Sequence, residues 1–224
     1  MLIASSLAVA SALLASAALT ARPLVTAPPL VVGVTVVSDI SPAQVRRVLA
    51  EAGDIWRAAG VTIVWQQEST PSPPSLRVTI GNWIGTGLGD DKSMPLGWII
   101  FTQGAPEHEI YVSYANTAAL MDLSRGSISL SDRMPRAERE TLLGRAMGRA
   151  LAHELGHFLL ASKAHSVSGL MRARRTATEF FAMDRSRFEV GAEQRASIAA
   201  RLTPPIVIAS RQSTAAGDAA FTSR

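Results

Sequence analysis

Two histidines and a glutamate stand together in the second half of the chain: His153, Glu154 and His157. On an α-helix, four residues make about one turn, so both imidazoles would project from one face and could bind one metal ion. Glu154 would lie within reach of a water molecule held by that ion. A third histidine, His165, follows in the same passage, which contains three of the four histidines of the chain. The pattern predicts a zinc site with His153, His157 and His165 as ligands and Glu154 as general base.

The composition limits what else the chain can be. Its 224 residues are 47% hydrophobic and 18% charged, which is typical of one globular domain with a hydrophobic core. The absence of cysteine excludes a disulfide framework, a zinc ribbon and a cysteine nucleophile, so zinc ligands must be His, Asp or Glu. The net charge of +4 comes almost entirely from arginines that are scattered along the chain. We therefore expect a solvated basic surface and no nucleic-acid partner.

The N-terminal segment is not expected to belong to the fold. Residues 2–21 are apolar or small, with no charge before Arg22, and Ala15-Ser16-Ala17 is typical of a signal-peptide cleavage site. We predict a signal peptide over 1–21, a linker over 22–29, a domain over 30–203 and a tail over 204–224. The chain would then be exported to the periplasm or secreted. A membrane anchor is the alternative, since about 20 residues could span a bilayer, but the alanine and serine content makes a stable anchor poor.

Hydrophobic patterns predict five strands and several helices. The first helix begins where Ser41 caps, Pro42 takes the first helical position and Gln44 completes a capping box; Gly60 ends it. The long helix with the histidines runs from about Met134-Pro135 to Ala161. Strands are predicted at 30–37, 61–66, 76–80, 97–101 and 109–114, with further helices at 116–123 and 188–202, and a short strand in the tail at 206–208.

The position of His165 constrains the path of the chain. His165 comes eight residues after His157, about 12 Å further along the axis if the helix continued. A zinc–nitrogen bond is about 2.1 Å long, so one ion could not then bind both residues. The chain must leave the helix near Ser162 and fold back for His165 to be a ligand. Weak helix formers between Ser162 and Gly169 favour such a reversal.

These residues resemble those of the metzincin zinc endopeptidases, whose pattern is H-E-x-x-H-x-x-G-x-x-H followed by a methionine turn beneath the zinc. Gly169-Leu170-Met171 is similar to that turn, with Met171 as a support for the site. The resemblance implies an α+β fold: a twisted, mixed five-stranded sheet with a helix after strand 1, a long active-site helix and a C-terminal helix. Two positions depart from the pattern, because Leu160 replaces the glycine and Lys163 replaces the third ligand. His165 is two residues late, which suggests a helix about half a turn longer.

The resemblance also implies an activity. Zinc would activate a water molecule, Glu154 would take its proton, and a peptide carbonyl would be attacked, with the substrate extended along 97–101 or 109–114. The substrate would be a peptide or protein. Two alternatives remain open. In the first, the site resembles that of the thermolysin-like zinc peptidases, with Glu179 as third ligand. In the second, the chain is an exported zinc-binding module without turnover.

Overall fold

The computed structural model of the chain describes residues 28–37, 39–67, 75–83, 94–126 and 134–203. The predicted signal peptide, most of the linker and the C-terminal tail, with its predicted short strand, lie outside these residues. Among the described helices, none is both long enough and apolar enough to cross a membrane.

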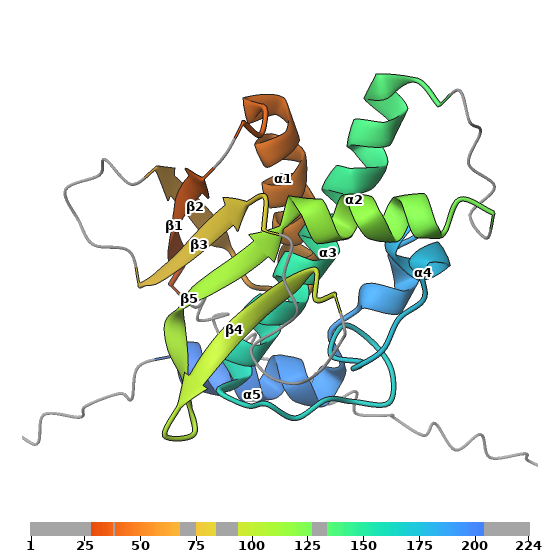
Figure 1. Cartoon of the computed structure of the whole chain (residues 1–224). Coiled ribbons are helices and arrows are strands. Elements are labelled where there is room, and N and C mark those ends of the chain that lie inside the picture. Colours follow the sequence, from red (N-terminus) through yellow and green to blue (C-terminus); the bar gives the residue numbers. More distant parts are fainter. Residues whose placement is uncertain (1–27, 38, 68–74, 84–93, 127–133, 204–224) are drawn as a thin grey trace, which may run out of the picture.

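A mixed five-stranded sheet forms one layer of the fold (Figure 1). The strands are β1 (Leu30–Val37), β2 (Ile63–Gln67), β3 (Leu76–Gly81), β4 (Gly97–Thr102) and β5 (Ala105–Ser113). Their order across the sheet is β2-β1-β3-β5-β4. All neighbours pair in parallel except β4, which lies antiparallel to β5 at the edge. The predicted α+β fold with a mixed five-stranded sheet is confirmed.

Helices cover one face of this sheet and extend beyond it (Figure 1). They are α1 (Pro42–Ala58), α2 (Tyr114–Leu123), α3 (Arg136–Leu160), α4 (Ala177–Phe181) and α5 (Ala192–Leu202), with a short 3₁₀ turn at Ser186–Phe188. The helix after the first strand, the long helix and the C-terminal helix are all present as predicted. Buried side chains of α1 and α3 form the main core together with β1, β3 and β5.

Three local predictions need correction. The strand predicted at 109–114 begins earlier, at Ala105, because Gln103 and Gly104 alone, with φ of 52° and 84°, make the turn after β4. The last helix begins at Ala192 and not at Phe188, because Gly191 is its N-cap. The first helix is capped as expected by the Ser41 hydroxyl, which accepts the Gln44 backbone N–H at 3.2 Å. Its capping box is incomplete, since the Gln44 amide is buried without a hydrogen-bond partner among the described residues.

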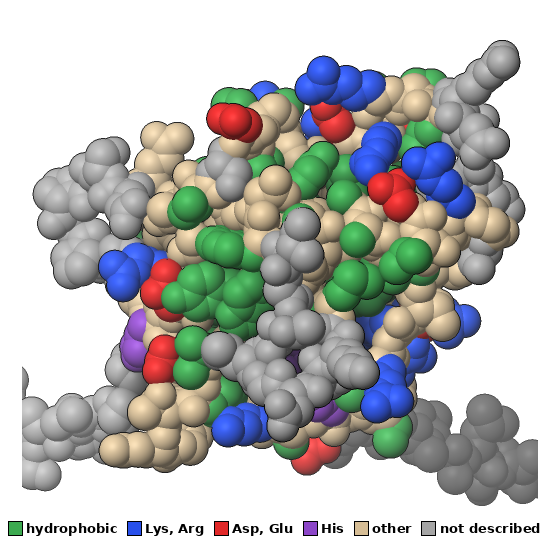
Figure 2. Space-filling view, in the orientation of Figure 1, with side chains coloured by type: hydrophobic (Ala, Val, Ile, Leu, Met, Phe, Trp, Pro, Cys, Tyr) green, Lys and Arg blue, Asp and Glu red, His purple; other side chains and the backbone are tan. Residues whose placement is uncertain are grey.

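An aromatic cluster fixes the β4–β5 hairpin. Trp98 of β4 is paired with Tyr111 of β5, and their rings stack at 5.3 Å between centroids. Trp83 packs edge-on against both rings at 5.9 Å. Cross-strand aromatic pairs of this kind stabilise a hairpin. Figure 2 shows hydrophobic side chains gathered over the strands on this side of the molecule. The cluster therefore holds the edge strand in place.

Glycine allows α1 and α3 to approach closely. A Cβ atom at Gly148 would lie 2.5 Å from the Cβ of Glu51 and 2.7 Å from the carbonyl oxygen of Val48. Both contacts involve atoms that cannot swing away without moving α1. The position of α3, and of the histidines on it, therefore depends on a residue without a side chain at this crossing.

Replacing Gly148 with alanine should destabilise the fold. The cost of overpacking, about 1–3 kcal/mol, should exceed the gain in helix propensity of about 1 kcal/mol. Urea denaturation of the wild type and the variant gives the change in the free energy of unfolding. Gly126→Ala is the control, since a Cβ there meets nothing within 4 Å. If Gly148→Ala is as stable as this control, the close approach of the two helices is not a constraint.

Candidate metal centre

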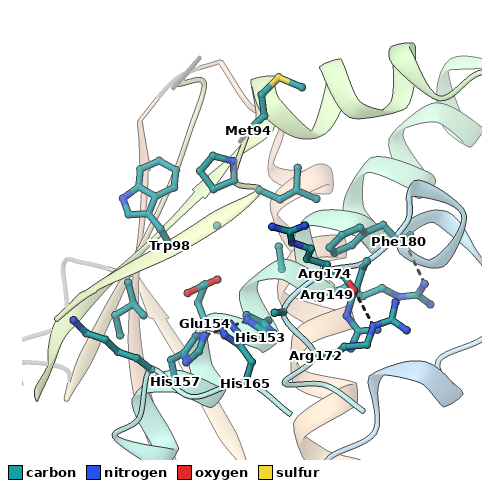
Figure 3. A pocket seen from close by; sticks show the side chains of 18 of the residues that line it. Met94, Trp98, Arg149, His153, Glu154, His157, His165, Arg172, Arg174 and Phe180 are labelled. Atoms are coloured by element: carbon teal, nitrogen blue, oxygen red, sulfur yellow. Dashed lines mark hydrogen bonds between the residues drawn. The ribbon is translucent and has the colours of Figure 1, made fainter. Parts of the chain in front are cut away.

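The structure brings together the three histidines that the sequence singled out. The candidate ligand nitrogens of His153, His157 and His165 all lie within 4.8 Å of one another. The rings of His153 and His165 stack at 5.3 Å, and His157 stands nearly perpendicular to both. Figure 3 shows the three side chains converging on one point at the floor of a cleft, with Glu154 beside them. This arrangement of ligand atoms is compatible with a shared metal ion.

The chain reverses direction between His157 and His165, as the spacing demanded. Helix α3 ends at Leu160, and Ala161 adopts the left-handed conformation with φ of 47°. Helices commonly end on such a residue, although glycine is the usual choice there. Leu160 stands where the metzincin pattern has its glycine, and the left-handed residue here comes one position later, at Ala161. His165 comes two positions later than the pattern. The longer helix therefore explains one of these two positions, and the loop after Ala161 explains the other.

Backbone carbonyls orient two of the histidines. Nδ1 of His153 lies 2.9 Å from the carbonyl oxygen of Leu170, and Nδ1 of His157 lies 2.7 Å from that of Ser162. A carbonyl oxygen can only accept, so both Nδ1 atoms must carry the hydrogen and donate. A metal-binding histidine typically donates its other ring N–H in this manner. Each neutral ring is therefore left with a bare Nε2.

The two bare nitrogens face each other. Nε2 of His153 lies 3.1 Å from Nε2 of His157. Because neither atom carries a hydrogen in the neutral rings, the pair cannot form a hydrogen bond, and two lone pairs are left in opposition. Burial lowers the pKa of His153 to about 4 and also lowers that of His157, which disfavours a proton between them. Two ligands of a tetrahedral zinc ion lie about 3.4 Å apart for bonds of about 2.1 Å, so the observed separation fits such an ion.

Glu154 occupies a buried position next to the histidines. Its side chain has no ion-pair partner within the described part of the chain, and burial raises its pKa to about 8. A hydrogen bond from the backbone of Ile99 on the edge strand opposes this shift. Gly97 leaves room for the carboxyl group, since a Cβ there would lie 3.2 Å from the Cγ of Glu154. Burying an ionisable carboxyl group lowers the stability of the folded protein. Packing of the core alone therefore does not explain why a glutamate occupies this position.

The predicted methionine turn lies beneath the histidine-bearing helix. Met171 is fully buried, and a side chain at Gly156 would collide with its sulfur atom. The turn itself is held by a hydrogen bond from the backbone N–H of Leu170 to the carbonyl oxygen of Glu189, at 2.7 Å. Gly169 has φ of 69°, which favours glycine. Leu170 thereby presents its carbonyl oxygen to His153, so the turn positions a candidate ligand.

Glu179, the alternative third ligand, and His108, the fourth histidine of the chain, lie away from this group. Glu179 caps α4 and forms ion pairs with Arg172 and Arg187, so the structure does not bring it to the histidines. His108 contacts the carbonyl oxygen of Ser75 at 2.7 Å through its Nδ1. Neither residue belongs to the group of ligand atoms found among the described residues.

A cleft of about 880 Å³ runs past the histidines. Strand β4 lines one side of it, and α3 contributes Ala150, His153, Glu154 and His157. The alternative that a substrate could lie along 109–114 is wrong, because β5 is paired on both edges, with β3 and β4. In the described part of the chain, β4 pairs only with β5, so its other edge is open to the cleft.

No protein-family model matches the sequence, and no curated protein matches it either. Among solved structures, the chain is similar to archaemetzincin from Methanopyrus kandleri, with 14% identity and a TM-score of 0.47 over 78% of this chain and 96% of that one. It is also similar to myroilysin, with 12% identity and a TM-score of 0.27 over 77% of this chain and 82% of that one. At this level of similarity, the function must be inferred from the residues of the site.

Residues that the sequence analysis did not single out also line the cleft. Arg172, Arg174 and Arg175 follow Met171 directly and form part of its wall. Lys163 stands where the metzincin pattern has its third ligand. Its Nζ lies over the ring of Phe101, 5.2 Å from the ring centroid. A signal was present in the sequence, since three of the four residues after Met171 are arginine. The expectation that the arginines are simply scattered is therefore wrong for these three, which gather at the cleft.

Proposed function

We propose that this chain is a zinc-dependent peptidase whose metal is held by His153, His157 and His165. Bound there, zinc would polarise the scissile carbonyl and make a water molecule acidic enough to lose a proton near neutral pH. Glu154 would be the base that takes this proton and the acid that returns it to the leaving amine. A peptide or protein segment would be the substrate.

The proposal rests mainly on the short distance between the unprotonated Nε2 atoms of His153 and His157. Each histidine donates its Nδ1 hydrogen to a backbone carbonyl, and the remaining nitrogens face each other at 3.1 Å. Without a cation, this arrangement is unfavourable in a buried site. With a cation between them, the lone pairs become ligands, and the exposed His165 is near enough to add a third.

The environment of Glu154 supports a catalytic role over a purely structural metal site. Burial raises its pKa to about 8, so in the absence of a cation this carboxyl group is mostly protonated at neutral pH. A divalent ion nearby would favour the charged form and lower that pKa. A metal centre that served only stability would gain nothing from a buried carboxyl group beside an open cleft. The alternative of a zinc-binding module without turnover is therefore less well supported.

The edge of β4 offers a place for the substrate backbone. An extended peptide can add to an open strand edge through main-chain hydrogen bonds. Strand β4 borders the cleft over most of its length, and Ile99, at its centre, contacts Glu154. A peptide on this edge would lie beside the general base and the candidate ligands. The aromatic cluster of Trp83, Trp98 and Tyr111 would hold this edge strand in place.

The zinc content of the purified protein tests the ligand set. The wild type should bind one zinc per chain after reconstitution, and His165→Ala should bind it far more weakly, since two histidines remain. Glu179→Ala should keep its zinc, because the carboxylate pairs with arginines instead. Loss of zinc only in Glu179→Ala would support the thermolysin-like alternative. Absence of zinc from the reconstituted wild type would refute the proposed metal centre.

The same preparations test the activity. Zinc-loaded wild type should hydrolyse a mixture of unstructured peptides, detected by mass spectrometry. A chelator should stop the reaction, and added zinc should restore it. A protein that binds zinc and hydrolyses none of these peptides would instead be a zinc-binding module.

A further inference from the structure

Basic side chains border the cleft on one side of the histidines. Arg172, Arg174 and Arg175 line it and are called the arginine wall below; Lys163 adds one further cation, whereas the charge of Arg149, which also lines the cleft, is paired with Glu51. Glu154 is the one acidic residue among the described residues that line this cleft. In Figure 2, Lys and Arg side chains lie on either side of the small histidine surface at the lower centre of the view. The cleft therefore carries a marked excess of positive charge, even before a metal ion is counted.

The members of the arginine wall differ in their partners. Arg172 forms an ion pair with Glu179. Arg175 donates to the carbonyl oxygens of Gly169 and Leu170; within the described part of the chain it contacts no carboxylate, and its buried Nε has no partner. Arg174 is exposed and pairs with no carboxylate in the described part of the chain. Among the described residues, only one of the three guanidinium groups of the wall contacts a carboxylate, and that carboxylate also pairs with Arg187, which leaves the wall short of negative charge.

The same contacts connect the wall to the candidate metal centre. The carbonyl oxygen of Leu170 accepts hydrogen bonds from both Arg175, at 3.1 Å, and His153, at 2.9 Å. Burial is the main reason that the pKa of Arg175 falls to about 10, and the nearby charge of Arg172 lowers it further. The wall therefore begins directly beside a candidate zinc ligand.

The backbone that carries Arg174 is well supported. The Phe188 ring lies between two guanidinium groups, with the Cζ of Arg149 at 4.5 Å and that of Arg175 at 4.0 Å from its centroid. Arg172 donates from Nε to the carbonyl oxygen of Arg174 at 2.8 Å. Figure 3 places Arg174 beside Phe180, on the side of the cleft away from Trp98. Arg174 thus presents to the cleft a guanidinium group that has no carboxylate partner among the described residues, on a backbone held by Arg172.

We propose that the arginine wall is a subsite for a carboxylate of the substrate, and that Arg174 is the residue that recognises it. The inference rests on the proposed peptidase function and adds a substrate class, peptides with a carboxylate close to the cleaved bond. That carboxylate is the side chain of an aspartate or glutamate, or the free C-terminus. Guanidinium groups bind carboxylates through paired, charge-assisted hydrogen bonds. A lysine or arginine side chain in the same place would be repelled.

Peptide binding tests the subsite apart from catalysis. The background is the zinc-loaded Glu154→Gln protein, in which the peptide should stay intact. Fluorescence anisotropy measures the Kd of labelled, amidated peptides in which one glutamate is moved along a neutral sequence, each beside its glutamine counterpart. A neutral peptide with a free C-terminus forms the second arm. Arg174→Gln and Arg46→Gln are then compared on this background; Arg46 is an exposed arginine of α1 that does not line the cleft.

At one position, glutamate should bind about tenfold more tightly than glutamine, the size expected for a charge-assisted hydrogen bond. Arg174→Gln should reduce this ratio to about twofold or less, while Arg46→Gln should leave it unchanged. Zinc content must be equal in all variants, because a carboxylate could also bind the metal. If only the free C-terminus improves binding, and does so through Arg174, the chain end is the source of the carboxylate.

Two results would overturn the subsite: equal affinity for glutamate and glutamine peptides at every position together with no gain from a free C-terminus, or a preference for a carboxylate that survives Arg174→Gln. The outcome is separable from that of the proposed function. Hydrolysis by the wild type without any preference for a carboxylate, either on a side chain or at the C-terminus, would retain the peptidase and remove the subsite. Binding that depends on Arg174, without hydrolysis by the wild type, would retain the subsite and remove the peptidase.

Discussion

Replacing Glu154 with glutamine is expected to abolish most peptide hydrolysis while leaving zinc bound. Glutamine has nearly the same shape and can remain in the space beside Gly97, but it cannot take a proton from water. Loss of a positioned general base typically lowers the rate by about 10²–10⁴-fold. The three histidines are unchanged in the variant, and the hydrogen bonds that orient His153 and His157 go to backbone carbonyls. Metal content and hydrolysis should therefore separate.

The measurement is kcat/KM for one cleaved peptide, with zinc content determined on the same samples. Glu109→Gln is the matched control, because Glu109 accepts a hydrogen bond from Thr79 and does not line the cleft. It should hydrolyse peptides at nearly the wild-type rate. Full activity in Glu154→Gln would exclude this residue as the base, and a parallel loss of zinc would show that its role is structural.

The sequence predicted the parts of this site that depend on local geometry. His153 and His157 lie on one face because the helix repeats every 3.6 residues, and any uninterrupted helix would place them so. The reversal before His165 followed from a distance limit and from weak helix formers. The five strands were visible in short β-branched or alternating runs. The position of Met171 beneath Gly156 was expected only from the resemblance to a methionine turn.

The remaining features depend on tertiary contacts that no local pattern encodes. The carbonyl groups that orient His153 and His157 come from Leu170 and Ser162, and only the folded path of the loop brings them there. The role of Glu179 was left open because its distance along the chain suits a ligand; the arginines that pair with it decide its place. The arginine wall was missed because the arginines were considered as a total charge and not by their position after Met171.

Removing the buried charge of Arg149 should produce the largest loss of stability. This side chain is fully buried on α3, and its Nε donates to Glu51 of α1 at 3.0 Å. Its remaining N–H groups donate to three backbone carbonyls in the segment 179–184. One residue thus joins the histidine-bearing helix to α1 and to the segment that follows the arginine wall. Arg149→Met would leave those carbonyls without donors and Glu51 short of a partner.

The expected cost of Arg149→Met is about 3–5 kcal/mol in the free energy of unfolding, as for other broken buried ion pairs. Arg185→Met is the matched control: Arg185 binds the same Glu51, but its side chain is 46% exposed, so its loss should cost about 1 kcal/mol or less. Urea denaturation with and without zinc measures both variants. Because an isolated buried carboxylate is worse than none, Glu51→Leu combined with Arg149→Met should recover part of the loss. If Arg149→Met and Arg185→Met lower the free energy of unfolding equally, the buried guanidinium group of Arg149 is not what holds α1, α3 and the 179–184 segment together.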